Sequence, residues 1–179
     1  MTQSIRDNDP VIFCEHKNLY AHESDVPTEA YTIPFGEANV VREGKDATIV
    51  TYGLMVHKAL EAADALAKEK VAAEVIDLRT LSPIDWETVI ESVENTGRLV
   101  VVDEAHPRCS IATDVSAYVG QNAFGALRAG AQMVTAPHTP VPFSAALEDL
   151  YIPSSTAIAA AVRKTLASGH EIGDRRKAS

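Results

Sequence analysis

The most constraining feature of this sequence is an alternation of strand-sized apolar runs and helix-periodic segments that starts near residue 45. Three runs have the length and the β-branched, apolar character of buried strands; they span Ala47–Gly53, Val71–Leu78 and Leu99–Glu104. Gln132–Thr135 is a shorter run of the same kind. Continuous apolar strands separated by helices are typical of a mainly parallel sheet that is buried on both faces.

Helix signals fill the intervals between these runs. Apolar residues recur at helical spacing in the segments 56–67 and 111–119. Between them, Ser82 as N-cap and Pro83 as first helical residue predict a helix start. Gly97 is placed to end that helix.

The predicted fold class is therefore α/β, a three-layer sandwich with helices on both faces of the sheet. This domain is expected to span residues 45–167, with a last helix beginning near Ser154. Right-handed crossovers bring the carboxyl ends of the strands to one edge, where such sheets bind their ligands. The segments 103–106 and 137–139 would meet at that edge.

The two ends of the chain lack this alternation of strand and helix patterns. Val11–Cys14 has the character of a strand, but no helix pattern follows it. The polar segment from His16 to Gly44 contains several Pro and Gly residues, which predicts a long irregular connection. Both features are explained if a preceding domain is nearly absent and is followed by a linker. Residues 1–44 are therefore interpreted as a remnant of that preceding domain plus an interdomain linker. Residues 168–179 are polar and predict a flexible tail.

Charge and length exclude several classes of function. The 179 residues include 16 Lys and Arg against 25 Asp and Glu, a formal net charge of −9. This charge repels phosphate backbones and anionic membranes, so neither nucleic acid nor a membrane is an expected partner. The apolar runs are far shorter than the roughly 20 residues of a membrane span. The N-terminus lacks a secretion-signal pattern, and a cytoplasmic location is expected.

Catalytic motifs are scarce. The turn after the first strand contains neither of the two common glycine-rich phosphate loops. Asp103 and Glu104 are neighbours on a strand and point to opposite sides, so capping the next helix or pairing with Arg108 is the expected role. His16 and His22 have no metal-ligand spacing and are assigned to a solvated linker.

Two self-contained alternatives remain open at this point. Cys109 lies near a predicted helix start with His106 one turn before it and His138 on a neighbouring loop, which would suit a cysteine-dependent hydrolase. A small-molecule-binding α/β protein is the other alternative, and it requires a polar, convergent pocket at the strand ends. From the residues alone, no autonomous active site is evident.

Several segments in order resemble one family, the β subunits of thiamine-diphosphate-dependent 2-oxo acid dehydrogenases, over their C-terminal half. The resemblance runs from about Asp9 to Leu166. Within the family, Asp103–Cys109 and Thr135–Phe143 are most similar to the acetoin and pyruvate dehydrogenase branch. The segments that carry it are Asp9–Tyr20, Ile33–Gly36, Thr51–Leu60, Asp77–Asp85, Val102–Ala105 and Leu147–Pro153.

The resemblance implies a transketolase-type C-terminal domain whose intact enzyme uses thiamine diphosphate and magnesium. It also implies that Val11–Glu15 is the last strand of a preceding pyrimidine-binding domain. In the family the cofactor is held by that domain and by the α subunit. No GDG-type diphosphate motif occurs here. The piece alone is therefore expected to hold no catalytic, cofactor-binding or metal-binding residue and to be inactive.

Assembly is the role that the resemblance leaves to this domain. The implied partners are an α subunit, a second β subunit in an α2β2 enzyme, and the peripheral-subunit-binding domain of the dihydrolipoyl acyltransferase core. An acidic surface suits that small, commonly basic domain. The residues expected at an interface or at the active-site entrance are Asp103, Glu104, His106, His138, Glu148 and Asp149.

Overall fold

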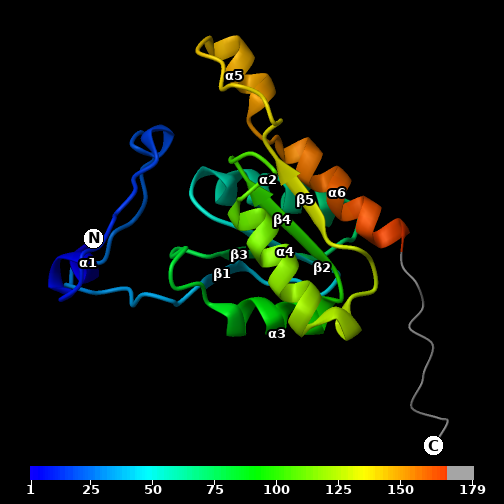
Figure 1. Cartoon of the computed structure of the whole chain (residues 1–179), viewed down its shortest axis with the longest axis horizontal. Coiled ribbons are helices and arrows are strands. Elements are labelled where there is room, and N and C mark those ends of the chain that lie inside the picture. The colour runs from blue at the N-terminus through cyan, green and yellow to red at the C-terminus, as the bar shows by residue number, and fades with distance from the viewer. Residues whose placement is uncertain (169–179) are drawn as a thin grey trace, which may run out of the picture.

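The computed structural model describes residues 1–168 and contains one five-stranded sheet with helices around it (Figure 1). No helix in this part of the chain is long and apolar enough to cross a membrane. In chain order the elements are α1 (Thr2–Arg6), η1 (Lys17–Leu19), β1 (Asn39–Arg42), β2 (Ala47–Thr51), α2 (Leu54–Lys68), β3 (Ala73–Asp77), α3 (Trp86–Thr96), β4 (Leu99–Asp103), α4 (Ile111–Asn122), η2 (Phe124–Ala126), β5 (Gln132–Thr135), α5 (Ala145–Tyr151) and α6 (Ser155–Ala167).

The sheet is mainly parallel, as the sequence predicts. Its strand order is β1-β3-β2-β4-β5, and β3, β2, β4 and β5 run parallel to one another. Every residue of the two central strands β2 and β4 is buried. Burial on both faces explains why these strands read as continuous apolar runs instead of alternating ones.

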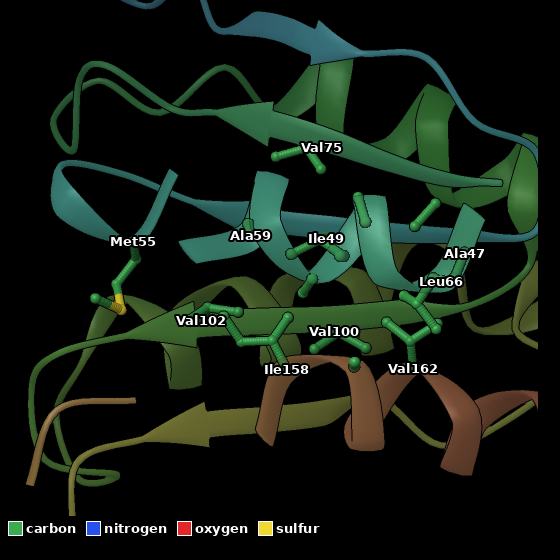
Figure 2. Close-up of a cluster of buried hydrophobic side chains, with 14 of the residues drawn as sticks. Ala47, Ile49, Met55, Ala59, Leu66, Val75, Val100, Val102, Ile158 and Val162 are labelled. Atoms are coloured by element: carbon green, nitrogen blue, oxygen red, sulfur yellow. The ribbon is translucent and has the colours of Figure 1, made fainter. Parts of the chain in front are cut away.

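Two apolar cores lie on opposite faces of the sheet. On one face, α2 and α6 pack on the strands through residues such as Leu66, Ile158 and Val162, which Figure 2 shows beside Ile49 and Val100. On the other face, a second buried cluster joins the sheet to α3 and α4. The three-layer sandwich is therefore confirmed.

The start of α3 differs from the prediction. Its N-cap is Asp85 and not Ser82, because the Asp85 carboxylate accepts hydrogen bonds from Thr88 N at 3.1 Å and Thr88 Oγ1 at 2.7 Å. The same carboxylate accepts from Ala38 N at 2.9 Å. Burial alone would raise the pKa of Asp85, but these hydrogen bonds lower it below its usual value. Gly97 ends the helix with a left-handed φ of 71°, as predicted.

The predicted irregular connection contains a strand. β1 lies within it and pairs antiparallel with β3, so the sheet includes residues before position 45. Four residues without apolar alternation give no strand signal, and tertiary pairing decides the conformation. The predicted strand at Val11–Glu15 is absent, because nothing pairs with it: Ile12 is 91% exposed on an arm that extends away from the domain (Figure 1).

The C-terminal part contains a helix that the sequence analysis did not predict. α5 has no buried residue and projects from the domain beside the start of α6 (Figure 1). The last helix begins at Ser155 with Ser154 as N-cap, as predicted. The predicted flexible tail at 168–179 lies, apart from Ser168, outside the described residues.

Candidate functional site at the carboxyl edge of the sheet

The connections of this sheet reverse direction between β2 and β4. The chain passes from β2 to β3 on one side and from β4 to β5 on the other, so the crevice between the carboxyl ends of β2 and β4 is the topological switch point. Open α/β sheets bind ligands at this position. Of the predicted site residues, Asp103 ends β4 there and Glu104 follows it.

Side chains of the protein itself bridge the switch point. The Tyr52 hydroxyl donates to Asp103 Oδ1 at 2.7 Å, and Thr51 Oγ1 donates to the Val102 carbonyl at 2.9 Å. Burial raises the pKa of Tyr52, and the hydrogen bond to Asp103 raises it further. Tyr52 was not singled out from the sequence; its place directly after β2 was the available signal.

Asp103 also organises the loop after β4. The side chain is buried, and it accepts hydrogen bonds from Ala105 N at 2.9 Å and Ala112 N at 3.3 Å. Since Ala112 lies in the first turn of α4, the prediction that Asp103 contacts the start of the next helix is confirmed. With three donors around it, this carboxylate has a structural role.

Glu104 points away from Asp103, as the strand geometry predicts. Its Oε2 lies 2.9 Å from His16 Nε2, and both side chains are about 30% exposed. His16 Nδ1 accepts from Asn18 N at 3.3 Å, which leaves Nε2 as the protonated nitrogen that donates to Glu104. His16 therefore fastens the N-terminal connection to the sheet edge. The expected solvated role of His16 is wrong. Of the two roles expected for the acidic pair, the contact with the next helix is observed at Asp103, and the ion pairs of residues 1–168 do not include Arg108.

His106 and His138 meet, as expected from the topology. Their ring centroids are 5.4 Å apart in an edge-to-face arrangement. The His106 Nδ1 lies 3.2 Å from the Pro137 carbonyl and 3.2 Å from the Tyr151 hydroxyl. Tyr151, at the end of α5, also donates to Thr139 O at 3.4 Å. The imidazole of His106 thus holds the loop after β5 and the end of α5 together.

Cys109 does not join this cluster. It is exposed, has a left-handed φ of 52°, and immediately precedes Ser110, the N-cap of α4. Within residues 1–168 the hydrogen bonds of His106 go to Pro137 and Tyr151, and no imidazole contacts the thiol. A cysteine-dependent hydrolase needs a base within reach of its nucleophile. The arrangement therefore gives that alternative no support.

Glu148 and Asp149 lie apart from the other candidates. Both are exposed on α5, which carries an apolar stripe on one side. Leu147 and Leu150, at i and i+3 on α5, are 54% and 82% exposed, and Phe143, which precedes the N-cap Ser144, is 102% exposed. The i, i+3 pair within the helix was the signal that the sequence offered for it. An uncovered apolar stripe beside two acids is typical of an interaction surface.

The acidic side chains at the carboxyl edge are engaged with groups of the protein itself. Among the described residues, no group of three or more His, Cys, Asp or Glu side chains could hold a metal. Asp103 and Glu104 are engaged by Tyr52 and His16. Burial raises the pKa of Asp77, a carboxyl group at the end of β3 that the sequence analysis missed, although Arg79 N donates to it at 3.1 Å. These residues do not fit thiamine diphosphate or its magnesium ion.

Comparison with known proteins identifies relatives of the whole domain. The family model for the transketolase C-terminal domain matches residues 36–158. The β subunit of acetoin:2,6-dichlorophenolindophenol oxidoreductase from Cupriavidus necator is 73% identical over 94% of this chain and 50% of its own length. The pyruvate dehydrogenase E1 component β subunit from Bacillus subtilis is 48% identical over 93% of this chain and 51% of its own length.

A solved structure has the same architecture. A split-gene transketolase described as an inactive β4 tetramer superposes with a TM-score of 0.69 and 31% sequence identity. The match covers 82% of this chain and 47% of that one. The chain thus spans about half the length of the relatives that it matches.

Proposed function

The chain belongs to the family of transketolase C-terminal domains, and on this premise we propose that it is the C-terminal domain of the β subunit of a thiamine-diphosphate-dependent dehydrogenase. The observation that carries the proposal is the 73% identity to an acetoin oxidoreductase β subunit over 94% of the chain. The intact enzyme is an oxidoreductase that acts on acetoin or on a 2-oxo acid such as pyruvate. A cytoplasmic location stays a prediction.

Acetoin is the first choice of substrate within this proposal. The acetoin enzyme's β subunit from Cupriavidus necator is 73% identical to this chain, whereas in Bacillus subtilis the β subunits of the acetoin and pyruvate enzymes are 50% and 48% identical to it, so the proposal rests on the first of these relatives. The contacts of this domain do not select a substrate, because its carboxyl edge is filled by its own side chains. Substrate choice then rests with other parts of the enzyme.

The domain on its own is proposed to be inactive. The carbanion chemistry of such an enzyme belongs to thiamine diphosphate, and protein groups position and tune that cofactor. The switch-point crevice, where such a sheet would bind a ligand, is bridged by Tyr52 and Asp103. The domain contributes surfaces that border and assemble the active centre rather than groups that react.

Thiamine diphosphate is expected to show no measurable binding to this chain, with magnesium present or absent. Isothermal titration calorimetry is the measurement, with a complete α2β2 enzyme of the family as the positive control. A micromolar dissociation constant for the chain alone would contradict the proposal, because that affinity corresponds to about −8 kcal/mol and requires a dedicated site.

Assembly through protein surfaces is the proposed role. The proposed partners are the α subunit, a second β subunit and the acyltransferase's peripheral-subunit-binding domain. Exposed apolar side chains on the N-terminal arm and on the α5 stripe support such contacts, since Ile12, Phe143 and Leu150 are more than 80% exposed. The structurally similar split-gene transketolase is a β4 tetramer, which supports association between chains of this kind.

The acyltransferase contact is proposed to include α5 and the chain from Leu150 onward. Glu148 and Asp149 are exposed there, and their charge complements a basic partner. Such pairs at the rim of an interface act mainly on the association rate. His106 and Tyr151 hold the end of α5 against the domain, which fixes where these acids point.

In the intact α2β2 enzyme, Glu148→Lys/Asp149→Lys is expected to slow association with the small acyltransferase domain by about tenfold at low salt. The difference should shrink as ionic strength rises past ~0.1 M, where the Debye length is about 10 Å. Surface plasmon resonance measures both rate constants. Glu37→Lys/Glu43→Lys changes the net charge equally at two exposed positions beside β1, at the sheet edge opposite β5, and serves as the control. Equal association rates for the two variants would place the docking surface elsewhere.

A further inference from the structure

A shallow open groove of about 570 Å³ runs between α3 and α4. These helices lie side by side on the same face of the sheet, with α3 at the end of the domain away from α5 (Figure 1). No residue of the groove belongs to the predicted site. Its lining residues are Trp86, Glu87, Ile90, Glu91, Glu94, Tyr118 and Asn122.

The floor of the groove is an aromatic platform. The rings of Trp86 and Tyr118, one from each helix, stack with centroids 3.9 Å apart and an interplanar angle of 16°. Trp86 and Ile90 pack with their inner sides against the buried cluster under α3 and α4. The platform is therefore held in place before any ligand arrives, which lowers the entropy that binding would cost.

The rim of the groove carries three carboxylates without a counter-charge. Glu87, Glu91 and Glu94 follow one another at i, i+4 and i+7 on α3, and all three are exposed. None of them takes part in the ion pairs of residues 1–168. Like charges at this spacing destabilise a helix by a few tenths of a kcal/mol per pair. Glu87, in the first turn, favours the N-terminus of α3, but the mutual repulsion of Glu91 with its neighbours in the row does not stabilise the helix.

We propose that this groove binds the cationic face of an amphipathic helix of a partner protein. Lysine or arginine side chains one turn apart would pair with the three carboxylates, which span about 10 Å along α3. Apolar side chains on the neighbouring stripe of the partner would cover Ile90 and the exposed parts of the aromatic platform. This contact is separate from the α5 surface and goes beyond the proposed function.

The chemistry of the groove favours this occupant over others. A nucleic acid or an anionic lipid would meet three negative charges. A second copy that presented the same groove would bring its own three carboxylates against these. A small cation would use the carboxylates but leave the platform uncovered. A helix that is both basic and apolar matches the rim and the floor together.

The test uses the intrinsic fluorescence of Trp86, which is the single tryptophan of the chain. The probe is a tryptophan-free amidated peptide of about 15 residues, with lysines at i, i+4 and i+7 and leucines on the adjoining stripe. Saturable change of the Trp86 emission is expected at low salt. Glu87→Gln/Glu91→Gln/Glu94→Gln should weaken binding by about tenfold or more, and a scrambled peptide of equal composition should bind as weakly.

A matched control separates this site from general charge attraction. Glu23→Gln/Asp25→Asn/Glu29→Gln removes three exposed acids from the N-terminal arm and should leave the affinity unchanged. Equal weakening by the two triple variants would overturn the proposal, and so would unchanged binding by the groove variant. A response of Trp86 to magnesium ions alone, with none to the peptide, would overturn it in favour of a small-cation site.

Discussion

Gly44→Ala is expected to destabilise the domain by about 3 kcal/mol or more. A Cβ atom at this position would lie 2.2 Å from Glu74 N, 2.3 Å from Ala73 C and 2.6 Å from Ala72 O. All three are backbone atoms at the start of β3, so no side-chain rotation relieves the clash. For a protein of this size, the melting temperature should fall by roughly 6–12 °C, which calorimetry or circular dichroism can measure.

Movement of the backbone would relieve this clash only by breaking hydrogen bonds. Lys45 N and Asp46 N both donate to the Ala72 carbonyl, at 3.0 and 2.9 Å, and Ala72 N donates to Asp46 Oδ2 at 2.7 Å. Gly120→Ala is the matched control, since a Cβ there meets nothing within 4 Å. Inside α4, alanine should leave stability unchanged or raise it by up to ~1 kcal/mol. Equal melting temperatures for the two variants would contradict the close approach at Gly44.

The close approach of Gly44 to the backbone at the start of β3 could not be predicted from the sequence. The central strands β2 and β4 were predictable because a strand buried on both faces requires an uninterrupted apolar run, and the partly buried β3 and the edge strand β5 were predictable from their β-branched, apolar residues. Gly44 reads as one more turn residue, since nothing in its neighbours indicates that the chain returns to within van der Waals contact at Glu74. Contacts of this kind are set by the packing of the sheet.

One part of the candidate site was predictable from the sequence, and another part was not. Strand order places 103–106 and 137–139 at one edge, so the meeting of His106 and His138 followed from topology. Tyr52 and His16 were not predictable as partners of Asp103 and Glu104, because those pairings depend on side-chain reach across neighbouring segments. The N-cap of α3 was misplaced because both Ser82 and Asp85 are good caps, and the contact of Asp85 with Ala38 decides between them.

Asp103→Ala is the second variant with a large expected effect, a loss of about 3–5 kcal/mol of unfolding free energy. The substitution removes the acceptor of the Tyr52 hydroxyl and of Ala105 N and Ala112 N. The hydrogen bond of Ala112 N is buried, and a buried donor left without a partner costs about 1–3 kcal/mol; those of the Tyr52 hydroxyl and Ala105 N are partly buried and each adds less. Urea unfolding measures the effect. Asp103→Asn keeps one acceptor oxygen and should lose less, and an Asp103→Ala variant as stable as wild type would show that water replaces the carboxylate.

Tyr52→Phe isolates one of these three hydrogen bonds and adds a dependence on pH. Near neutral pH, loss of the hydroxyl should cost about 1 kcal/mol.

The pKa of Tyr52 is raised above its ordinary value of 10.0, by burial first and by Asp103 second. Above pH 10 the unfolded chain therefore loses this proton more readily than the folded one. Wild-type stability should fall there by up to ~1.4 kcal/mol per pH unit, less in proportion to the partial exposure of the ring. Because phenylalanine cannot ionise, the gap between wild type and Tyr52→Phe should close as the pH rises, and a constant gap would show that Tyr52 keeps an ordinary pKa.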